Sequence, residues 1–156
     1  MKSTITCPIA TITETLRFLQ ASGKNHCEGI ALWLGTRERN TIHVQTVYEP
    51  AHRAEADFFH IPRQSMFQLK EYLRQNRLFI AAQVHSHPFE AFHSDADNRW
   101  AIIRHTGALS IVIPNFAANT TPTTFLNDAA IYQLSQDNKW ERVPQRTVEK
   151  LCKITP

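Results

Sequence analysis

Two histidines and an aspartate lie close together in the sequence, at spacings that suit metal binding. His85 and His87 are separated by one residue and precede Pro88, and Ser94 and Asp97 follow three residues apart. Side chains at i and i+2 of a strand project to the same face, so the two imidazoles can point into one space. On a helix that begins near Ser94, positions i and i+3 share a face, so Asp97 can face that space too. Two imidazoles and one carboxylate converging in this way would form a zinc site whose fourth position is open.

Simpler interpretations exist for several of these residues. Ser94 and Asp97 also match a helix capping pattern, in which the serine caps the N-terminus and an acidic residue lies in the first turn. Ser94 can both cap the helix and contribute to the metal site. Ser86, between the two histidines, should point to the opposite face, which favours a structural role. His93 is close enough in sequence to reach the site, but its position favours a loop residue.

Composition narrows the class of protein. The chain has 156 residues, of which 42% are hydrophobic, enough for one domain with its own core over residues 1–156. The formal net charge is +3 and the basic residues are scattered, so nucleic acid is not an expected partner. The three cysteines are far apart and predict neither a disulfide framework nor a thiolate zinc site. No apolar stretch approaches the roughly 18 residues of a membrane span, so we expect a cytoplasmic protein without a membrane partner.

Hydrophobic periodicity predicts the elements that must position these side chains. Helices are predicted around residues 12–23, from 61 to 76, over 95–104 and over 147–154. Strands are predicted over 28–35, 41–48, 78–84 and 109–113, followed by a hairpin of 131–134 with 140–143. Residues 49–60, 88–93 and 115–124 are predicted loops. This order indicates a mixed α/β (α+β) fold, in which helices flank a central sheet and the site forms where strand ends meet helix starts.

A longer pattern adds a family resemblance. The motif His85-Ser86-His87-Pro88, then Ser94 and Asp97, with Glu28 far upstream before an apolar strand, resembles the JAB/MPN+ (JAMM) zinc metalloprotease family. The resemblance extends from the first predicted helix to the strand before Pro114. It implies an MPN/JAB domain of the cytidine deaminase-like type, with a central mixed β-sheet flanked by helices. The gap between Pro88 and Ser94 holds five residues, where many relatives have six, and we interpret this as a loop difference.

The resemblance also implies a role for each site residue. His85, His87 and Asp97 would bind zinc (Zn2+), which lowers the pKa of bound water to about 7. Glu28 would be the general base and acid that takes a proton from this water and returns it to the leaving amine. Ser94 would donate a hydrogen bond to the oxyanion of the tetrahedral intermediate.

The substrate follows from the resemblance alone. Segments 89–94, 107–110 and 113–116 are similar to small bacterial JAB proteins that accompany E1-like, E2-like and ubiquitin-like partners, including Bil-type and CBASS-type antiphage systems. The implied reaction is cleavage after the C-terminus of a ubiquitin-like protein, in conjugates or precursors. Residues 49–60 and 115–124 are the expected contact loops. Two alternatives stay open: a metal-free MPN scaffold that binds partners, and a hydrolase that acts on sulfur-carrier proteins or small amides.

Overall fold

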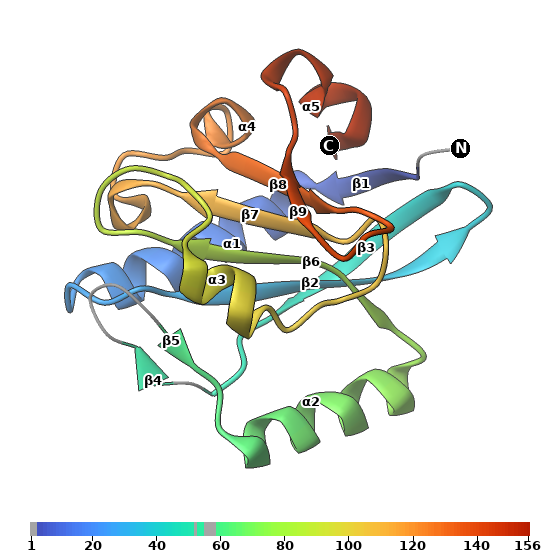
Figure 1. Cartoon of the computed structure of the whole chain (residues 1–156), viewed down its shortest axis with the longest axis horizontal. Coiled ribbons are helices and arrows are strands. Elements are labelled where there is room, and N and C mark those ends of the chain that lie inside the picture. Colours follow the sequence, from blue (N-terminus) through green and yellow to red (C-terminus); the bar gives the residue numbers. More distant parts are fainter. Residues whose placement is uncertain (1–2, 52, 55–58) are drawn as a thin grey trace.

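A single large sheet organises the chain. The computed structural model describes residues 3–51, 53–54 and 59–156, and Figure 1 traces its elements in sequence order. Eight strands pair in the order β10-β1-β3-β2-β6-β7-β8-β9, and β4 pairs with β5 separately. The strands are β1 (Thr4–Pro8), β2 (Ile30–Glu38), β3 (Thr41–Tyr48), β4 (Arg53–Ala54), β5 (Phe59–His60), β6 (Phe79–Ser86), β7 (Leu109–Ile113), β8 (Ala130–Leu134), β9 (Trp140–Arg142) and β10 (Cys152–Thr155). The helices are α1 (Ile9–Gly23), α2 (Arg63–Asn76), α3 (Asp95–Trp100), α4 (Phe125–Asp128) and α5 (Gln145–Leu151), with a 3-10 turn η1 (Asn115–Ala117).

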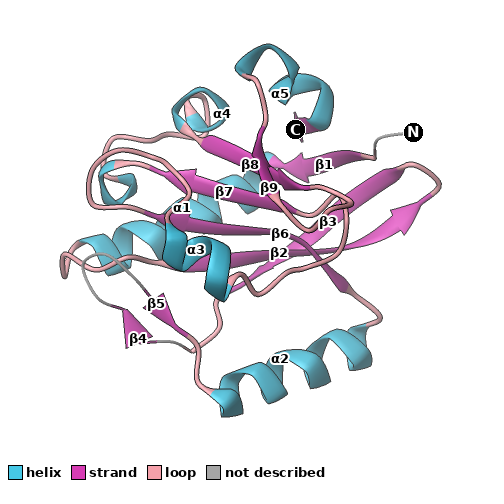
Figure 2. Cartoon of the chain, in the orientation of Figure 1, coloured by secondary structure: helices cyan, strands magenta, loops and turns pink. Residues whose placement is uncertain are grey.

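The sheet is mixed and helices cover both of its faces. β1 runs parallel to β3 and β10, and β6 runs parallel to β7, whereas β2 is antiparallel to both β3 and β6. Figure 2 shows α1 on one side of the sheet and α3 on the other. The predicted mixed α/β class, with helices around a central sheet, is therefore confirmed. Among the described residues, no helix combines the length and the apolar character needed to cross a membrane.

The larger core lies between α1 and the sheet. Ile12, Leu16 and Leu19 are the buried stripe of α1, at the spacing that predicted this helix. They pack in one cluster with Trp33, which is fully buried and stacks on Phe125 at a centroid distance of 5.8 Å. The Trp33 ring nitrogen donates to the Thr15 hydroxyl at 2.9 Å, and that hydroxyl donates to the Thr11 carbonyl at 2.7 Å. The polar edge of a large buried side chain is thus satisfied by α1 itself.

A smaller core lies on the other face of β2. Residues 30–35 are completely buried, as expected for a strand covered on both sides. Ile30, Leu32 and Leu34 cluster with Leu69 of α2, because alternate positions of a strand face opposite sides. Leu69 of α2 is 1% exposed, and Met66 and Leu73 on the same helix are partly buried against this cluster.

Both chain ends differ from the prediction. No strand was predicted at the position of β1, and the helix predicted over 147–154 stops at Leu151 before β10 begins. β1 and β10 pair with each other in parallel, with Ile5 opposite Cys152. Such short strands are stabilised by partners distant in sequence, so their local periodicity is a weak signal.

The segments around the site also differ in extent. The helix predicted over 95–104 is too long, since α3 ends at Trp100. Ile102 N–H donates to the Gln83 side chain, and Ile103 is buried in a separate cluster, so the chain leaves the helix to make these contacts. The predicted loop 49–60 contains β4 and β5, with residues 52 and 55–58 outside the described residues. The predicted loop 115–124 begins with η1.

Candidate metal centre

β6 delivers the two histidines to one place. His85 is the second-last residue of β6 and fully buried, and His87 follows the strand with 3% exposure. Ser86 between them faces away, and its hydroxyl accepts the Gly29 N–H at 2.9 Å. The His87 backbone is held on both sides, because its N–H donates to Ile113 O at 2.9 Å and its carbonyl accepts from Phe116 N–H at 2.8 Å. The strand periodicity therefore directs both imidazoles to the same side, as predicted.

The short helix α3 supplies the carboxylate. Ser94 is its N-cap, and a complete capping box joins Ser94 to Asp97. The Asp97 N–H donates to the Ser94 hydroxyl at 3.1 Å, and the Ser94 N–H donates to Asp97 Oδ2 at 2.8 Å. The capping interpretation of this pair is correct, and the same capping bonds fix the orientation of the carboxylate.

Three potential ligand groups converge within a few ångströms. His85 Nε2 lies 3.2 Å from His87 Nε2, and the two nitrogens lie 3.1 Å from Asp97 Oδ1 and Oδ2, respectively. All three residues are buried and form a group that could hold a metal ion. Ligand atoms on a tetrahedral zinc, at bonds of about 2.0–2.1 Å, would be about 3.3 Å apart. The observed spacing and the donor set of two imidazoles and one carboxylate fit zinc.

The pKa of Asp97 differs in direction from that of an ordinary buried carboxyl group, which is raised by burial. Burial acts to raise the pKa of Asp97, but hydrogen bonds from His85 and His87 outweigh it and lower the pKa below its ordinary value. The Ser94 backbone N–H contributes in the same direction. Asp97 is therefore held as a carboxylate, which is the form that binds a cation.

Glu28 reaches the cluster from the segment that leads into β2. It lies two residues before β2, is 1% exposed, and places Oε1 3.7 Å from His87 Nε2. The next residue, Gly29, pairs with Ser86, which ties the Glu28 segment to the end of β6. A Cβ at Gly29 would lie 3.1 Å from Leu19 Cα and from the Ser22 hydroxyl, so glycine allows this close approach to α1. The structure thus brings Glu28 to the three groups from a position 57 residues before His85 in the sequence.

His93 is the residue that the sequence prediction undervalued. Its ring nitrogens contact Ser110 Oγ at 3.0 Å and Asn98 Oδ1 at 2.6 Å, and its backbone N–H donates to the Tyr132 hydroxyl at 3.1 Å. It remains on a loop, as predicted, but it joins this loop to the sheet and to α3. The available sequence signal was the polar residue Ser110 inside a five-residue strand that is otherwise apolar.

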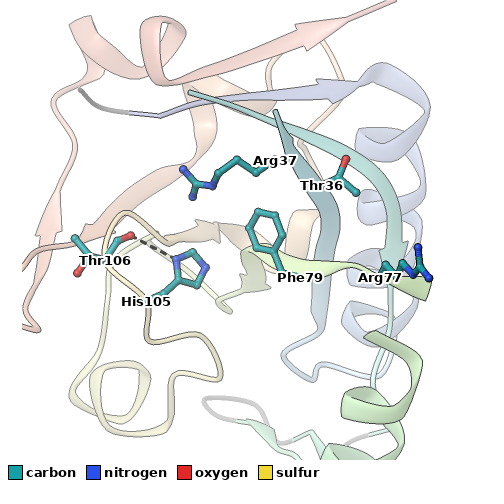
Figure 3. Close-up of a pocket in the computed structure, with 6 residues that line it drawn as sticks. All are labelled: Thr36, Arg37, Arg77, Phe79, His105 and Thr106. Atoms are coloured by element: carbon teal, nitrogen blue, oxygen red, sulfur yellow. Dashed lines mark hydrogen bonds between the residues drawn. The ribbon is translucent and has the colours of Figure 1, made fainter. Parts of the chain in front are cut away.

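Two hollows occur near these elements. One, of about 400 Å³, adjoins the loop after His87 and is lined by Phe89, Glu90, Ala91, Pro114, Asn115, Asn127, Asp128, Ala129, Arg142 and Gln145. The other, of about 630 Å³, lies at the opposite end of β6, where Figure 3 shows the Phe79 ring beside Arg37 and His105. It is lined by Thr36, Arg37, Arg77, Phe79, His105 and Thr106. Because this hollow includes none of the cluster residues, we do not count it as part of the metal centre.

The sequence identifies the family to which this fold and cluster belong. The model of prokaryotic homologs of the JAB domain matches residues 11–126, most of the chain, so the protein belongs to this family. A similar protein is the probable metalloprotease y4jG of Sinorhizobium fredii (strain NBRC 101917 / NGR234). It is 30% identical over 156 residues, with 97% of this chain and 94% of that protein covered. The predicted family resemblance is therefore confirmed.

Solved structures agree on the fold. The solution structure of protein DSY2949 from Desulfitobacterium hafniense matches with a TM-score of 0.70 at 16% identity, covering 97% of this chain and 92% of that one. The solution structure of a protein from Salinibacter ruber (strain DSM 13855) matches with a TM-score of 0.56 at 17% identity, covering 92% and 89%. At these identities the likeness concerns the fold alone.

Proposed function

We propose that the protein is a zinc-dependent peptidase of the JAMM type, which hydrolyses an amide bond after the C-terminus of a ubiquitin-like protein. The observation that carries this proposal is the buried Glu28 carboxylate, 3.7 Å from His87 and beside the cluster of His85, His87 and Asp97. Three ligand groups alone describe a metal site, whereas an adjacent carboxylate adds a group that can move protons. The 30% identity to a probable metalloprotease supports the same class of activity.

Glu28 is the proposed general base and acid. Its Oε1 would accept a proton from the attacking water as the water oxygen bonds to the amide carbon. The same carboxyl would then give the proton to the leaving nitrogen as the carbon–nitrogen bond breaks, so that the net change is addition of one water. A zinc ion held by His85, His87 and Asp97 would supply Lewis acidity toward the carbonyl oxygen and lower the pKa of the water.

Ser94 is the proposed oxyanion donor, and the capping geometry leaves it able to act. A serine hydroxyl offers one proton and two lone pairs. The Asp97 N–H uses one lone pair, at 3.1 Å, and the hydroxyl proton stays available to a substrate oxygen. Ser94 is half-buried, which is compatible with contact to both the helix and a bound substrate.

The proposed substrate class rests on the family resemblance, and the exposed aromatic side chains beside the cluster are compatible with it. Phe89 and Phe92 lie on the loop between His87 and Ser94 and are 76% and 50% exposed, so both rings are accessible to a partner. The Phe92 ring stands edge-on to His87 at a centroid distance of 4.8 Å. An extended tail can add as a strand beside a sheet edge, and we propose the strands β4 and β5 and the 115–124 loop as its contacts. Partners from a bacterial ubiquitin-like pathway, including E1-like and E2-like proteins, are part of this proposal, as is a cytoplasmic location.

The experiment is a cleavage assay with a panel of substrates. The zinc-loaded protein would be incubated with linear ubiquitin-like fusions, isopeptide-linked conjugates, sulfur-carrier fusions and small amides. We expect cleavage of the ubiquitin-like substrates by the wild type and a loss of at least about 100-fold in Glu28→Gln, typical of removing a general base. Mass spectrometry of the products would locate the cleaved bond.

The matched control is Glu38→Gln, which changes an exposed glutamate at the far end of β2 and should keep full activity. Full cleavage by Glu28→Gln would overturn the assigned base. Cleavage only of the sulfur-carrier fusions or of the small amides would replace the substrate class. A protein that binds no metal and cleaves nothing would instead be a scaffold that only binds partners.

A further inference from the structure

A continuous chain of hydrogen-bonded polar groups, buried at Gln83 and Ser110, links β6, β7 and both ends of α3. Gln83 of β6 and Ser110 of β7 are directly opposite each other, are 1% and 0% exposed, and hydrogen-bond at 3.1 Å. The Ser110 hydroxyl also hydrogen-bonds to His93, which lies just before α3. His93 in turn hydrogen-bonds to Asn98, within the helix. Gln83 also accepts the N–H of Ile102, just beyond the end of the helix, at 3.0 Å.

The donors and acceptors of this chain run in one consistent direction. The Ile102 N–H can only donate, which makes the Gln83 oxygen the acceptor and leaves the Gln83 nitrogen to donate to Ser110. Asn98 Oδ1 can only accept, so His93 Nδ1 carries the proton and His93 Nε2 accepts from the Ser110 hydroxyl. Every link in the chain is thus satisfied by a single tautomer.

α3 requires such external support. It has six residues, and isolated helices shorter than about 12–15 residues are marginal in water. Asp97 nevertheless has to stay within 3.1 Å of two histidines that belong to a different element. The capping box orients Asp97 within the helix, but it does not fix the helix relative to β6. The polar chain does so at both ends of the helix, and it starts from Gln83, two residues before His85 on the same face of the strand.

We propose that His93 is a positioning residue that, with Gln83, Ser110 and Asn98, holds Asp97 in register with His85 and His87 for metal binding. This inference rests on the proposed metal centre and deepens it. Aromatic contacts reinforce the position, because the His93 ring lies 4.9 Å from Tyr132 and 5.3 Å from Trp140, both on the β8–β9 hairpin. His93 acts through Asp97 and does not itself join the ligand set.

The test is metal affinity, measured without a peptidase assay. Zinc and Co2+ dissociation constants would be determined by chelator competition for the wild type, His93→Ala, Ser110→Ala and the milder Asn98→Ala, which truncates an exposed side chain. We expect a 10- to 100-fold weaker affinity in His93→Ala, the usual range for residues that support metal ligands. The Co2+ absorption spectrum should change as well, and amide exchange of α3 should accelerate. Asn98→Ala should show a smaller change in the same direction.

Val84→Ala is the matched control, because Val84 lies on the same strand, is fully buried and packs in the core on the α1 side. It should lower the melting temperature and keep the metal affinity within twofold. An unchanged affinity in His93→Ala and Asn98→Ala, or an equal loss of affinity in Val84→Ala, would overturn the proposal. A protein that binds metal and cleaves nothing would contradict the proposed function. The comparison of metal affinities among these variants would still test the role of His93.

The tautomer offers an independent readout. Nitrogen-15 NMR of the metal-free wild type should report His93 with its proton on Nδ1, and Ser110→Ala should disturb that pattern. A proton on Nε2 in the wild type would contradict the direction of the chain.

Discussion

The two faces of β6 and β7 are both buried, but one face is apolar and the other is polar. Toward α1, Val84 and Ile111 belong to a wholly apolar cluster. Toward α3, Gln83, His85 and Ser110 form hydrogen-bonded polar groups, and none of the three is more than 1% exposed. The alternation of a strand allows one backbone to serve a stable core and a reactive site at once. Burial by itself therefore does not identify the site, and the partners of each side chain do.

Titratable groups on the two sides illustrate the same difference. Cys152 belongs to the apolar cluster, where burial raises the pKa of its thiol to about 12. Asp97 is also buried, but its hydrogen bonds to His85 and His87 outweigh burial and lower its pKa. The apolar face suppresses charge, while the polar face stabilises it.

The largest expected effect is the loss of metal from the polar face. His87→Ala should abolish zinc binding, because one of three ligands is removed and the remaining two leave the ion poorly held. Metal analysis of the purified protein after zinc loading would measure this. His105→Ala, a histidine in the hollow at the other end of β6, should keep its metal. Stoichiometric zinc in His87→Ala would refute the ligand assignment.

The apolar face should instead respond in stability. Ile111→Ala creates a cavity in a fully buried position and should lower the free energy of unfolding by about 2–5 kcal/mol. Chemical denaturation would measure the loss, and the folded variant should bind zinc with an affinity close to that of the wild type. A comparable loss of zinc affinity would mean that the two faces are not independent.

Ser94→Ala should separate catalysis from metal binding within the polar face. We expect the variant to retain zinc and to turn over about 10- to 1,000-fold more slowly, because an oxyanion donor is lost. Removing the N-cap should also lower stability by about 1 kcal/mol. Steady-state kinetics with parallel metal analysis would measure both effects. If the variant loses its metal, capping is the main role of Ser94.

The smallest expected effect is a pH dependence on the apolar face. Burial raises the pKa of Cys152 from 9.0 to about 12, so the contribution of this thiol to stability is complete below pH 9 and declines as the pH rises. Between pH 8 and pH 10 the wild type should lose about 1 kcal/mol more than Cys152→Ala. Denaturant titrations at the two pH values would test this, and parallel slopes for the two proteins would contradict it.

The fold was predictable where a hydrophobic pattern extends over many residues of a single segment. The burial of α1, the apolar run of β2 and the hairpin of β8 with β9 all follow from periodicity within one segment. The short strands β1 and β10 were missed, because their pairing joins the two ends of the chain. The end of α3 was misplaced, because a tertiary hydrogen bond to Gln83 replaces the next helical turn.

The sequence by itself determined the local half of the site. The spacing of His85 and His87 on a strand, and of Ser94 and Asp97 at a helix start, follows from backbone periods of 2 and 3.6 residues, which hold in any fold. Only the tertiary structure decided that the two pairs meet, that Glu28 lies beside them, and that His93 ties α3 to β7. Contacts between distant segments depend on how whole elements pack, and neither spacing nor composition encodes that packing locally. The family resemblance anticipated Glu28, whereas no pattern in the sequence assigned a function to His93.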